Sequence, residues 1–131
     1  MTEFDCLELT FHESIALLRL NRPTLHNRFD AALHREFPHA LAMTASHKDV
    51  AALVIAADGP SFSAGGDLRM MLEANASAEL RSQLKREALD IVDGLIDMPV
   101  PVIAAVQGNA IGLGATVLAC CDMVVATRKV R

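Results

Sequence analysis

The chain has 131 residues, of which 52% are hydrophobic and 21% are charged, and its formal net charge is −4. This length and composition favour one domain with its own core and argue against disorder. Lys and Arg are scattered and form no basic stripe, so we expect no nucleic-acid partner. The three cysteines are a poor disulfide framework and residues 1–9 lack a signal-peptide pattern, so we expect a reducing, cytoplasmic location.

The first half of the chain predicts strands that flank one helix. The apolar patterns indicate strands at 4–11, 14–20 and 51–57, the first two joined by a short turn, and a helix at 31–47. Asp30 is a good N-cap for this helix, and Pro38 should kink or divide it.

The second half continues the alternation. We expect a helix that begins at Leu68 and is capped by Asp67, and an amphipathic helix over 77–97. A strand at 102–106, a helix at 115–121 and a last strand at 122–126 follow. Strands that alternate with helices predict βαβ units and a mainly parallel sheet.

The region 100–126 carries a single charge, Asp122, and resembles a membrane span by hydropathy alone. Three glycines interrupt it and two prolines lie at its start. We therefore expect two buried strands with a short helix between them and no membrane association.

Two glycine-rich loops share one design. SFSAGGDL (61–68) and GNAIGLGAT (108–116) each follow an apolar strand and open a helix. Backbone N–H groups at a helix start have no intrahelical partner and can hold an anionic oxygen. Two N–H groups that converge on one oxygen form an oxyanion hole, although a single Gly-rich turn is more often only a turn. Neither loop matches a dinucleotide-binding or P-loop pattern.

Three segments together resemble the enoyl-CoA hydratase/isomerase family, the crotonase superfamily. LNRPTLHN at 20–27 resembles its LNRPxxxNA segment, and ALVIAADGPSFSAGGDL at 52–68 resembles its strand followed by FxAGxDL. PVIAAVQGNAIGLGATVLACCDMVVA at 101–126 resembles a third family block. The resemblance covers nearly the whole chain.

The resemblance implies an α/β fold of the crotonase type, a ββα superhelix shared with ClpP. Residues 1–131 would be its N-terminal core, truncated before the C-terminal helical region. It also implies an acyl-CoA thioester as partner, assembly into trimers or dimers of trimers, and no separate cofactor, since CoA is part of the substrate.

By position, the resemblance implies that the backbone N–H groups of Gly66 and Leu113 form the oxyanion hole. The residues implied to contact CoA are Leu25, His26, Ala64, Gly65, Asp67 and Leu68. Arginines that could neutralise its phosphates are Arg22, Arg28 and Arg69.

One family position differs. Thr116 stands where hydratases of the family carry their first catalytic glutamate, and a threonine hydroxyl cannot act as that general base. We expect this hydroxyl to bond a helix carbonyl. The second family acid would lie beyond residue 131.

Other polar and sulfur side chains have structural interpretations. Asp67 is a helix cap rather than a base, and Cys120 and Cys121 are expected to be buried small apolar residues. The five histidines suggest no metal site, and His34 and His39 are expected on a surface helix.

Three functions remain open from the sequence. The first is an acyl-CoA enzyme with isomerase-like or hydratase-like chemistry. The second is a non-catalytic CoA-ester binder or assembly subunit that keeps the oxyanion loops and lacks the acids. The third is a structural α/β domain whose loops bind nothing.

Overall fold

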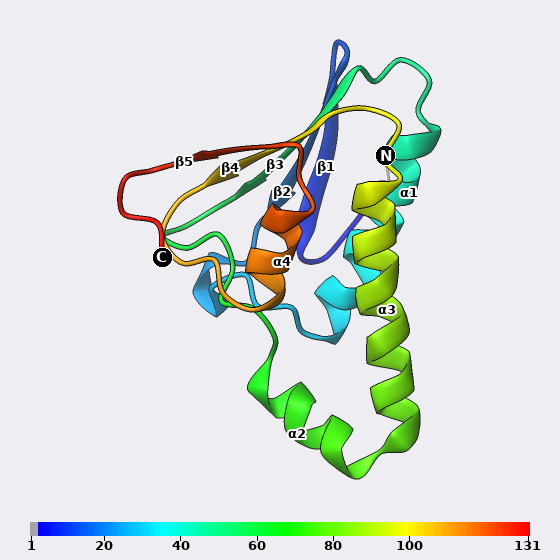
Figure 1. Cartoon of the computed structure of the whole chain (residues 1–131), viewed down its shortest axis with the longest axis vertical. Helices are drawn as coiled ribbons and strands as arrows, with labels where there is room; N and C mark the ends of the chain where they lie inside the picture. The colour runs from blue at the N-terminus through cyan, green and yellow to red at the C-terminus, as the bar shows by residue number, and fades with distance from the viewer. Residues whose placement is uncertain (1–2) are drawn as a thin grey trace.

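The computed structural model describes residues 3–131, which form one five-stranded sheet with helices packed on it (Figure 1). The strands are β1 (Leu7–His12), β2 (Ile15–Leu20), β3 (Ala52–Ala57), β4 (Val102–Val106) and β5 (Met123–Ala126). The helices are α1 (Ala31–Ser46), α2 (Leu68–Ala76), α3 (Ala78–Ile96), α4 (Leu113–Ala119) and the short 3-10 helix η1 (Pro23–Leu25). The predicted order of elements is therefore confirmed, with boundaries shifted by up to three residues.

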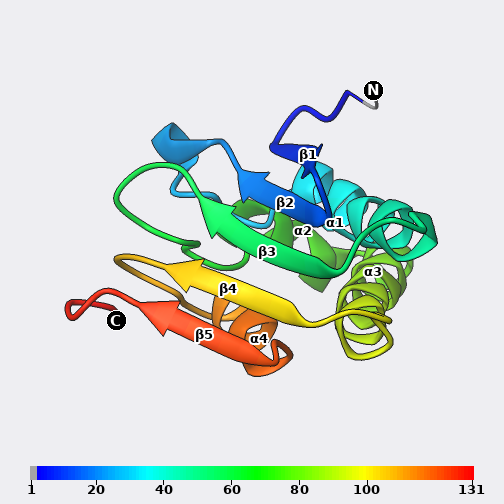
Figure 2. The same cartoon turned by 90° about the horizontal axis from the view of Figure 1, so that it is seen from above.

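The sheet is mixed, with the order β1-β2-β3-β4-β5. β1 and β2 form an antiparallel hairpin, whereas β2 to β5 are all parallel. Parallel strands end at the same edge of a sheet, and Figure 2 shows the arrowheads of β2 to β5 side by side. The loops that leave β2, β3 and β4 therefore lie next to one another, and these loops contain the predicted site.

Side-chain caps begin the longer helices. The carboxylate of Asp30 accepts a hydrogen bond from Leu33 N, and that of Asp67 accepts one from Met70 N. The hydroxyl of Ser77 does the same for Leu80 N at the start of α3. These bonds satisfy amides that have no intrahelical partner. α1 and α2 begin at the residues predicted from their caps, whereas the cap at Ser77 was not predicted and α3 begins one residue later than expected.

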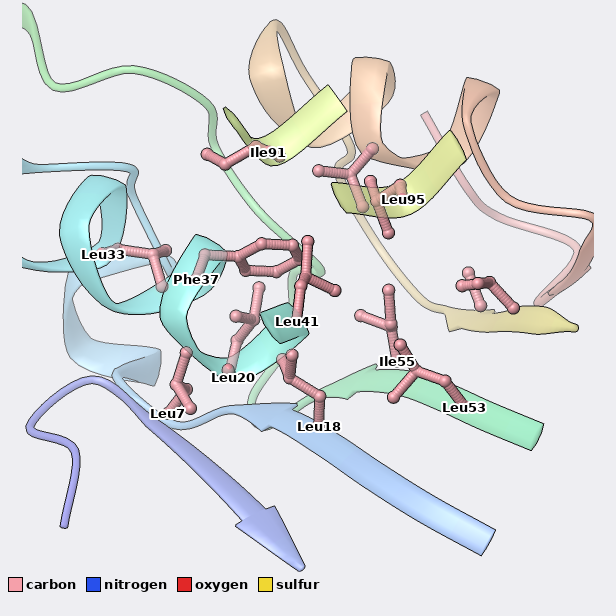
Figure 3. Close-up of a cluster of buried hydrophobic side chains, with 14 of the residues drawn as sticks. Leu7, Leu18, Leu20, Leu33, Phe37, Leu41, Leu53, Ile55, Ile91 and Leu95 are labelled. Carbon is pink, nitrogen blue, oxygen red and sulfur yellow. The ribbon is translucent and has the colours of Figure 1, made fainter. Parts of the chain in front are cut away.

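The core lies between one face of the sheet and helices α1 and α3. Alternate residues of β2 and β3 point to this face, as the two-residue period of a strand requires. Figure 3 shows these side chains against those of the two helices; the labelled residues are Leu7, Leu18, Leu20, Leu33, Phe37, Leu41, Leu53, Ile55, Ile91 and Leu95. α2 extends away from the sheet (Figure 1).

Two expectations for α1 need correction: Pro38 does not divide the helix, and His34 is not on its surface. The helix runs unbroken through Pro38, because the residues on either side of it, Phe37 and Leu41, are buried in the core and hold the backbone. Pro38 removes one helix hydrogen bond, and this packing outweighs the loss. His34 is not on the surface: it is 5% exposed and shares the buried face with Phe37 and Leu41, three and seven residues on.

The expectation of two buried strands in 100–126 is half right. β4 alternates between buried and half-buried residues, but all four residues of β5 are exposed. β5 is an edge strand, and among residues 3–131 it pairs only with β4. Cys120 and Cys121 are half-buried rather than buried. Within residues 3–131, no helix is both long enough and apolar enough to cross a membrane.

Candidate active site

The loop after β2 is anchored by the side chain of Asn27. Its Oδ1 accepts a hydrogen bond from Arg22 N at 2.9 Å. Its Nδ2 donates to the carbonyl oxygens of Asp58 at 3.0 Å and Ser61 at 3.1 Å, on the loop after β3. Asn27 is 2% exposed and has a left-handed backbone with φ of 50°. The first loop is therefore fixed against the second by a buried amide group.

Ser63 connects the loop after β3, which is the first glycine loop, to the loops after β2 and β4. Its hydroxyl donates to the carbonyl of Asn27 at 2.8 Å and accepts from the N–H of Gly65 at 3.1 Å. Its backbone N–H donates to Asn109 O at 3.0 Å, and its carbonyl accepts from Ile111 N at 3.1 Å. These bonds place the two glycine loops side by side as a short parallel β-bridge between Ser63 and Ala110.

The two loops touch at Gly65. Its φ is +85°, a conformation that favours glycine, and a Cβ placed there would lie 2.5 Å from the carbonyl oxygen of Ile111. On the other loop, a Cβ on Gly112 would lie 4.0 Å from the amide nitrogen of Gly66. The residue before Leu113 thus lies within van der Waals range of Gly65 and Gly66.

The amides of Gly66 and Leu113 remain without an acceptor in the described part of the chain. Neither N–H donates any backbone or side-chain hydrogen bond there. Leu113 is the first residue of α4, so its N–H has no intrahelical partner. The helix begins two residues earlier than the sequence predicted. Two unpaired N–H groups therefore sit on adjoining loops at one edge of the sheet.

The residues predicted near CoA are brought to the same edge. His26 O accepts a hydrogen bond from Ala64 N at 2.9 Å, which places the turn at Leu25 and His26 beside the first glycine loop. Asp67 caps α2, as predicted, rather than standing free as a base. Leu68, the first residue of α2, is 67% exposed.

The three candidate arginines differ in what they already bind. Arg22 lies 2.6 Å from Asp30, and both side chains are half-buried. Burial by itself would raise the pKa of Asp30, but hydrogen bonds from Arg22 and Leu33 N outweigh it, and the pKa is lowered. Arg22 is therefore committed to a structural ion pair.

Arg28 and Arg69 remain more accessible. Arg28 Nε is 3.9 Å from Asp67 Oδ1, at the outer limit of an ion pair. Arg69 is exposed and lies 3.7 Å from Glu73 on the same helix. The first contact is at the distance limit and the second joins two exposed charges, so both are weak and both guanidinium groups can turn toward an anion.

Thr116 lies on the exposed side of α4, and its Oγ1 donates to Gly112 O at 3.2 Å. The structure confirms the predicted hydroxyl-to-carbonyl bond. A threonine hydroxyl at physiological pH cannot replace a carboxylate as a general base. Among residues 3–131, no group of three or more His, Cys, Asp or Glu side chains is placed to hold a metal ion.

Three polar residues that organise the site were not assigned a role from the sequence. They are Asn27, Ser63 and Gln107. Gln107 donates from Nε2 to the carbonyls of Ala57 at 2.7 Å and Gly59 at 2.9 Å. All three are uncharged residues that lie beside glycine or proline turns. An amide or hydroxyl at such a place can satisfy several loop carbonyls and amides, and this is the signal that could have identified them.

The fold and the paired glycine loops define a class: α/β proteins that present two backbone amides at the carboxyl edge of a parallel sheet. A family model described as enoyl-CoA hydratase/isomerase matches residues 10–131. The chain therefore belongs to the enoyl-CoA hydratase/isomerase family, as the three sequence segments predicted.

Relatives in this family carry different reaction names. A 4-chlorobenzoyl coenzyme A dehalogenase from Arthrobacter is 34% identical over 120 residues, which are 89% of this chain and 43% of the relative. A mitochondrial enoyl-CoA hydratase domain-containing protein from Danio rerio is 30% identical over 95% of this chain and 44% of its own length. The chain thus spans a little under half the length of these relatives.

Solved structures confirm the crotonase fold. A Mycobacterium smegmatis enoyl-CoA hydratase superposes with a TM-score of 0.88 at 33% identity, covering 96% of this chain and 49% of that one. A Legionella pneumophila structure that carries the crotonase name gives a TM-score of 0.90 at 32% identity, covering 98% of this chain and 50% of its own. The described fold corresponds to about half of each.

Proposed function

We propose that the chain binds an acyl-CoA thioester with the thioester oxygen between the N–H groups of Gly66 and Leu113. The observation that carries this proposal is the pair of unbonded amides on two touching loops. Family membership supports it, because the relatives named above differ in reaction but share a coenzyme A thioester in their names. CoA is then the handle of the substrate and not a cofactor.

The proposed chemistry follows from where charge develops. When a base takes the α-proton of a thioester, or water adds to the β-carbon of an enoyl thioester, the electron pair of the carbonyl bond moves onto oxygen. Two fixed N–H donors bind that oxygen more tightly than they bind the neutral carbonyl, so they lower the barrier. Loss of one such donor costs about 3 kcal/mol of transition-state stabilisation in well-studied enzymes. We place this chain in hydratase-like or isomerase-like chemistry on that basis.

A second candidate function is a CoA-ester binder or assembly subunit without catalysis. The observation that favours it is Thr116, because its hydroxyl is bonded to Gly112 O and supplies no carboxylate beside the amides. Both candidates use the same site and predict the same ligand. They differ only in turnover.

The decisive experiment is a pair of titrations with [1-13C]acetyl-CoA and with S-ethyl-CoA, which lacks the carbonyl. We expect acetyl-CoA to bind at least fivefold more tightly and its 13C carbonyl resonance to move downfield, because two donors polarise the bond. Equal affinities with an unshifted carbonyl would refute the proposal. Replacing the Gly65–Gly66 amide by an ester through chemical synthesis removes one N–H and should abolish most of the preference.

A crotonyl-CoA hydration assay then separates the two candidates. Turnover that falls with the Gly66 ester substitution supports the enzyme, and binding without turnover supports the binder. If acetyl-CoA, CoA and S-ethyl-CoA all fail to bind, only a structural role remains.

We also propose that the chain associates with copies of itself, as trimers or dimers of trimers. Support comes from the apolar edge strand β5, in which Met123 is 59% exposed and Val125 is 58% exposed. Contiguous exposed apolar residues on a sheet edge favour association. Sedimentation at several protein concentrations tests this proposal.

A further inference from the structure

The N–H of Gly66, the first of the two amides, is oriented through the preceding residue, Gly65. The carbonyl of Gly65 accepts a hydrogen bond from Phe29 N at 2.7 Å, and its N–H donates to the hydroxyl of Ser63 at 3.1 Å. A trans peptide is planar, so the N–H of Gly66 points opposite to the carbonyl of Gly65. Whatever orients Gly65 therefore orients the Gly66 N–H.

The hydroxyl of Ser63 is fully committed to this arrangement. It accepts from Gly65 N and donates to Asn27 O at 2.8 Å, and Ser63 is 0% exposed. Phe29, which holds the other side of Gly65, lies two residues after Asn27 on the same loop. One buried hydroxyl thus completes a closed ring of hydrogen bonds between the loop after β2 and the first glycine loop.

The N–H of Leu113, the second amide, also depends on Ser63. The backbone N–H and C=O of Ser63 bond Asn109 O and Ile111 N, which fixes the loop that leads into Leu113. Gly114 lies so close that a Cβ there would be 2.9 Å from Ser63 Cβ. A shift of Ser63 would therefore move both loops together.

We propose that Ser63, supported by Asn27, is a positioning residue that sets the direction of the Gly66 N–H and its alignment with that of Leu113. The inference rests on the proposed function, because positioning matters only if these amides bind a thioester oxygen. Ser63 itself does not touch the substrate. Without the hydroxyl, Gly65 N–H and Asn27 C=O lose their buried partners, and among the described residues only the bond from Phe29 N to Gly65 O still orients the peptide that carries the Gly66 N–H.

The test uses Ser63→Ala and a matched control. Thr44 is also buried, at 1% exposed, and its hydroxyl donates to Ala40 O at 2.9 Å within α1, outside the three loops of the site. Thr44→Val therefore also removes a buried hydroxyl without touching those loops. Ser63→Cys keeps a weak donor and acceptor at the same place.

The first readout is the ratio of the affinities for acetyl-CoA and S-ethyl-CoA. We expect Ser63→Ala to reduce this ratio at least fivefold while the affinity for S-ethyl-CoA changes less than twofold. Ser63→Cys should recover part of the ratio, and Thr44→Val should leave it unchanged. If the wild type binds acetyl-CoA more tightly than S-ethyl-CoA and Ser63→Ala keeps the same ratio, the positioning role is overturned.

The second readout needs no ligand. Amide hydrogen exchange followed by NMR should be at least tenfold faster at Gly65 in Ser63→Ala than in Thr44→Val when the two have equal global stability. Unchanged exchange at Gly65 overturns the inference. If the wild type shows no preference for the thioester but Gly65 exchange responds to Ser63, the proposed function fails and the role of Ser63 in holding the loop stands.

Discussion

Gly65 and Ile111 are in direct backbone contact: a Cβ on Gly65 would meet the carbonyl oxygen of Ile111 at 2.5 Å. Gly65 is buried and its φ is +85°. The two glycine loops can therefore pack together only if residue 65 has no side chain. This contact brings the amides of Gly66 and Leu113 to the same edge of the sheet.

Gly65→Ala should lower the free energy of unfolding by about 2 kcal/mol or more, because it combines a left-handed backbone with a steric clash. Gly66→Ala is the matched control, since a Cβ there would meet only the flexible side chain of Met71, at 3.5 Å. Its effect on stability should be below about 1 kcal/mol. Urea unfolding followed by circular dichroism measures both. Equal losses would show that the contact does not constrain residue 65.

Glu36 should contribute stability that is lost in acid. Its carboxylate accepts hydrogen bonds from Asp5 N at 2.8 Å, Cys6 N at 3.0 Å and Cys6 Sγ at 2.7 Å. Burial by itself would raise the pKa of Glu36, but these bonds outweigh it, and the pKa is lowered from 4.5. A lowered pKa means that the contribution is complete above pH 4.5 and is lost as the pH falls through the folded value.

Glu36→Gln should therefore cost about 1 kcal/mol at pH 7 and flatten the fall in stability below pH 4.5. Urea midpoints at pH 7, 5, 4 and 3 measure the effect. Glu73→Gln, at an exposed pair with Arg69, should keep the slope of the wild type. Parallel curves for Glu36→Gln and wild type would contradict this role of Glu36.

The thiol of Cys121 should react slowly at neutral pH. Burial, followed by the neighbouring Cys120 and Asp122, raises its pKa to about 11. Only the thiolate is alkylated, so the rate with iodoacetamide should rise about tenfold per pH unit between pH 8 and 10. Peptide mass spectrometry gives the rate at each cysteine, and circular dichroism verifies that the fold persists. A rate that levels off below pH 10 would refute the raised pKa.

Val125→Lys should weaken self-association at least tenfold, because it places a charge on the apolar edge strand β5. Thr10→Lys adds the same charge to an exposed residue of β1, the opposite edge, and should leave association unchanged. Sedimentation equilibrium of the three proteins compares them. An equal effect of both substitutions would point to net charge instead of β5.

Thr116→Ala should leave the affinity for acetyl-CoA within twofold of wild type. The hydroxyl of Thr116 bonds only Gly112 O in the described residues, and its side chain is exposed. Isothermal titration calorimetry measures the affinity. A loss of tenfold or more would show that the hydroxyl contacts the ligand.

Local patterns were sufficient for the elements and for part of the site. The helix starts after Asp30 and Asp67 follow from the capping preference of a carboxylate, and the strands follow from short apolar runs. The family segments predicted which two glycine loops supply the amides of the candidate site. The bond from Thr116 to a helix carbonyl was also predictable, since it joins residues four apart in sequence.

The sequence alone determined the order of strands and helices, the family and the positions of the glycine loops, because these depend on residues close together in the chain. Tertiary structure decided that His34 is buried, that α1 continues through Pro38 and that β5 is exposed at the sheet edge. It also decided that Asn27 and Ser63, 36 residues apart, share a hydrogen bond. Such features depend on which distant segments meet, and packing between segments outweighs the local preference of a single residue.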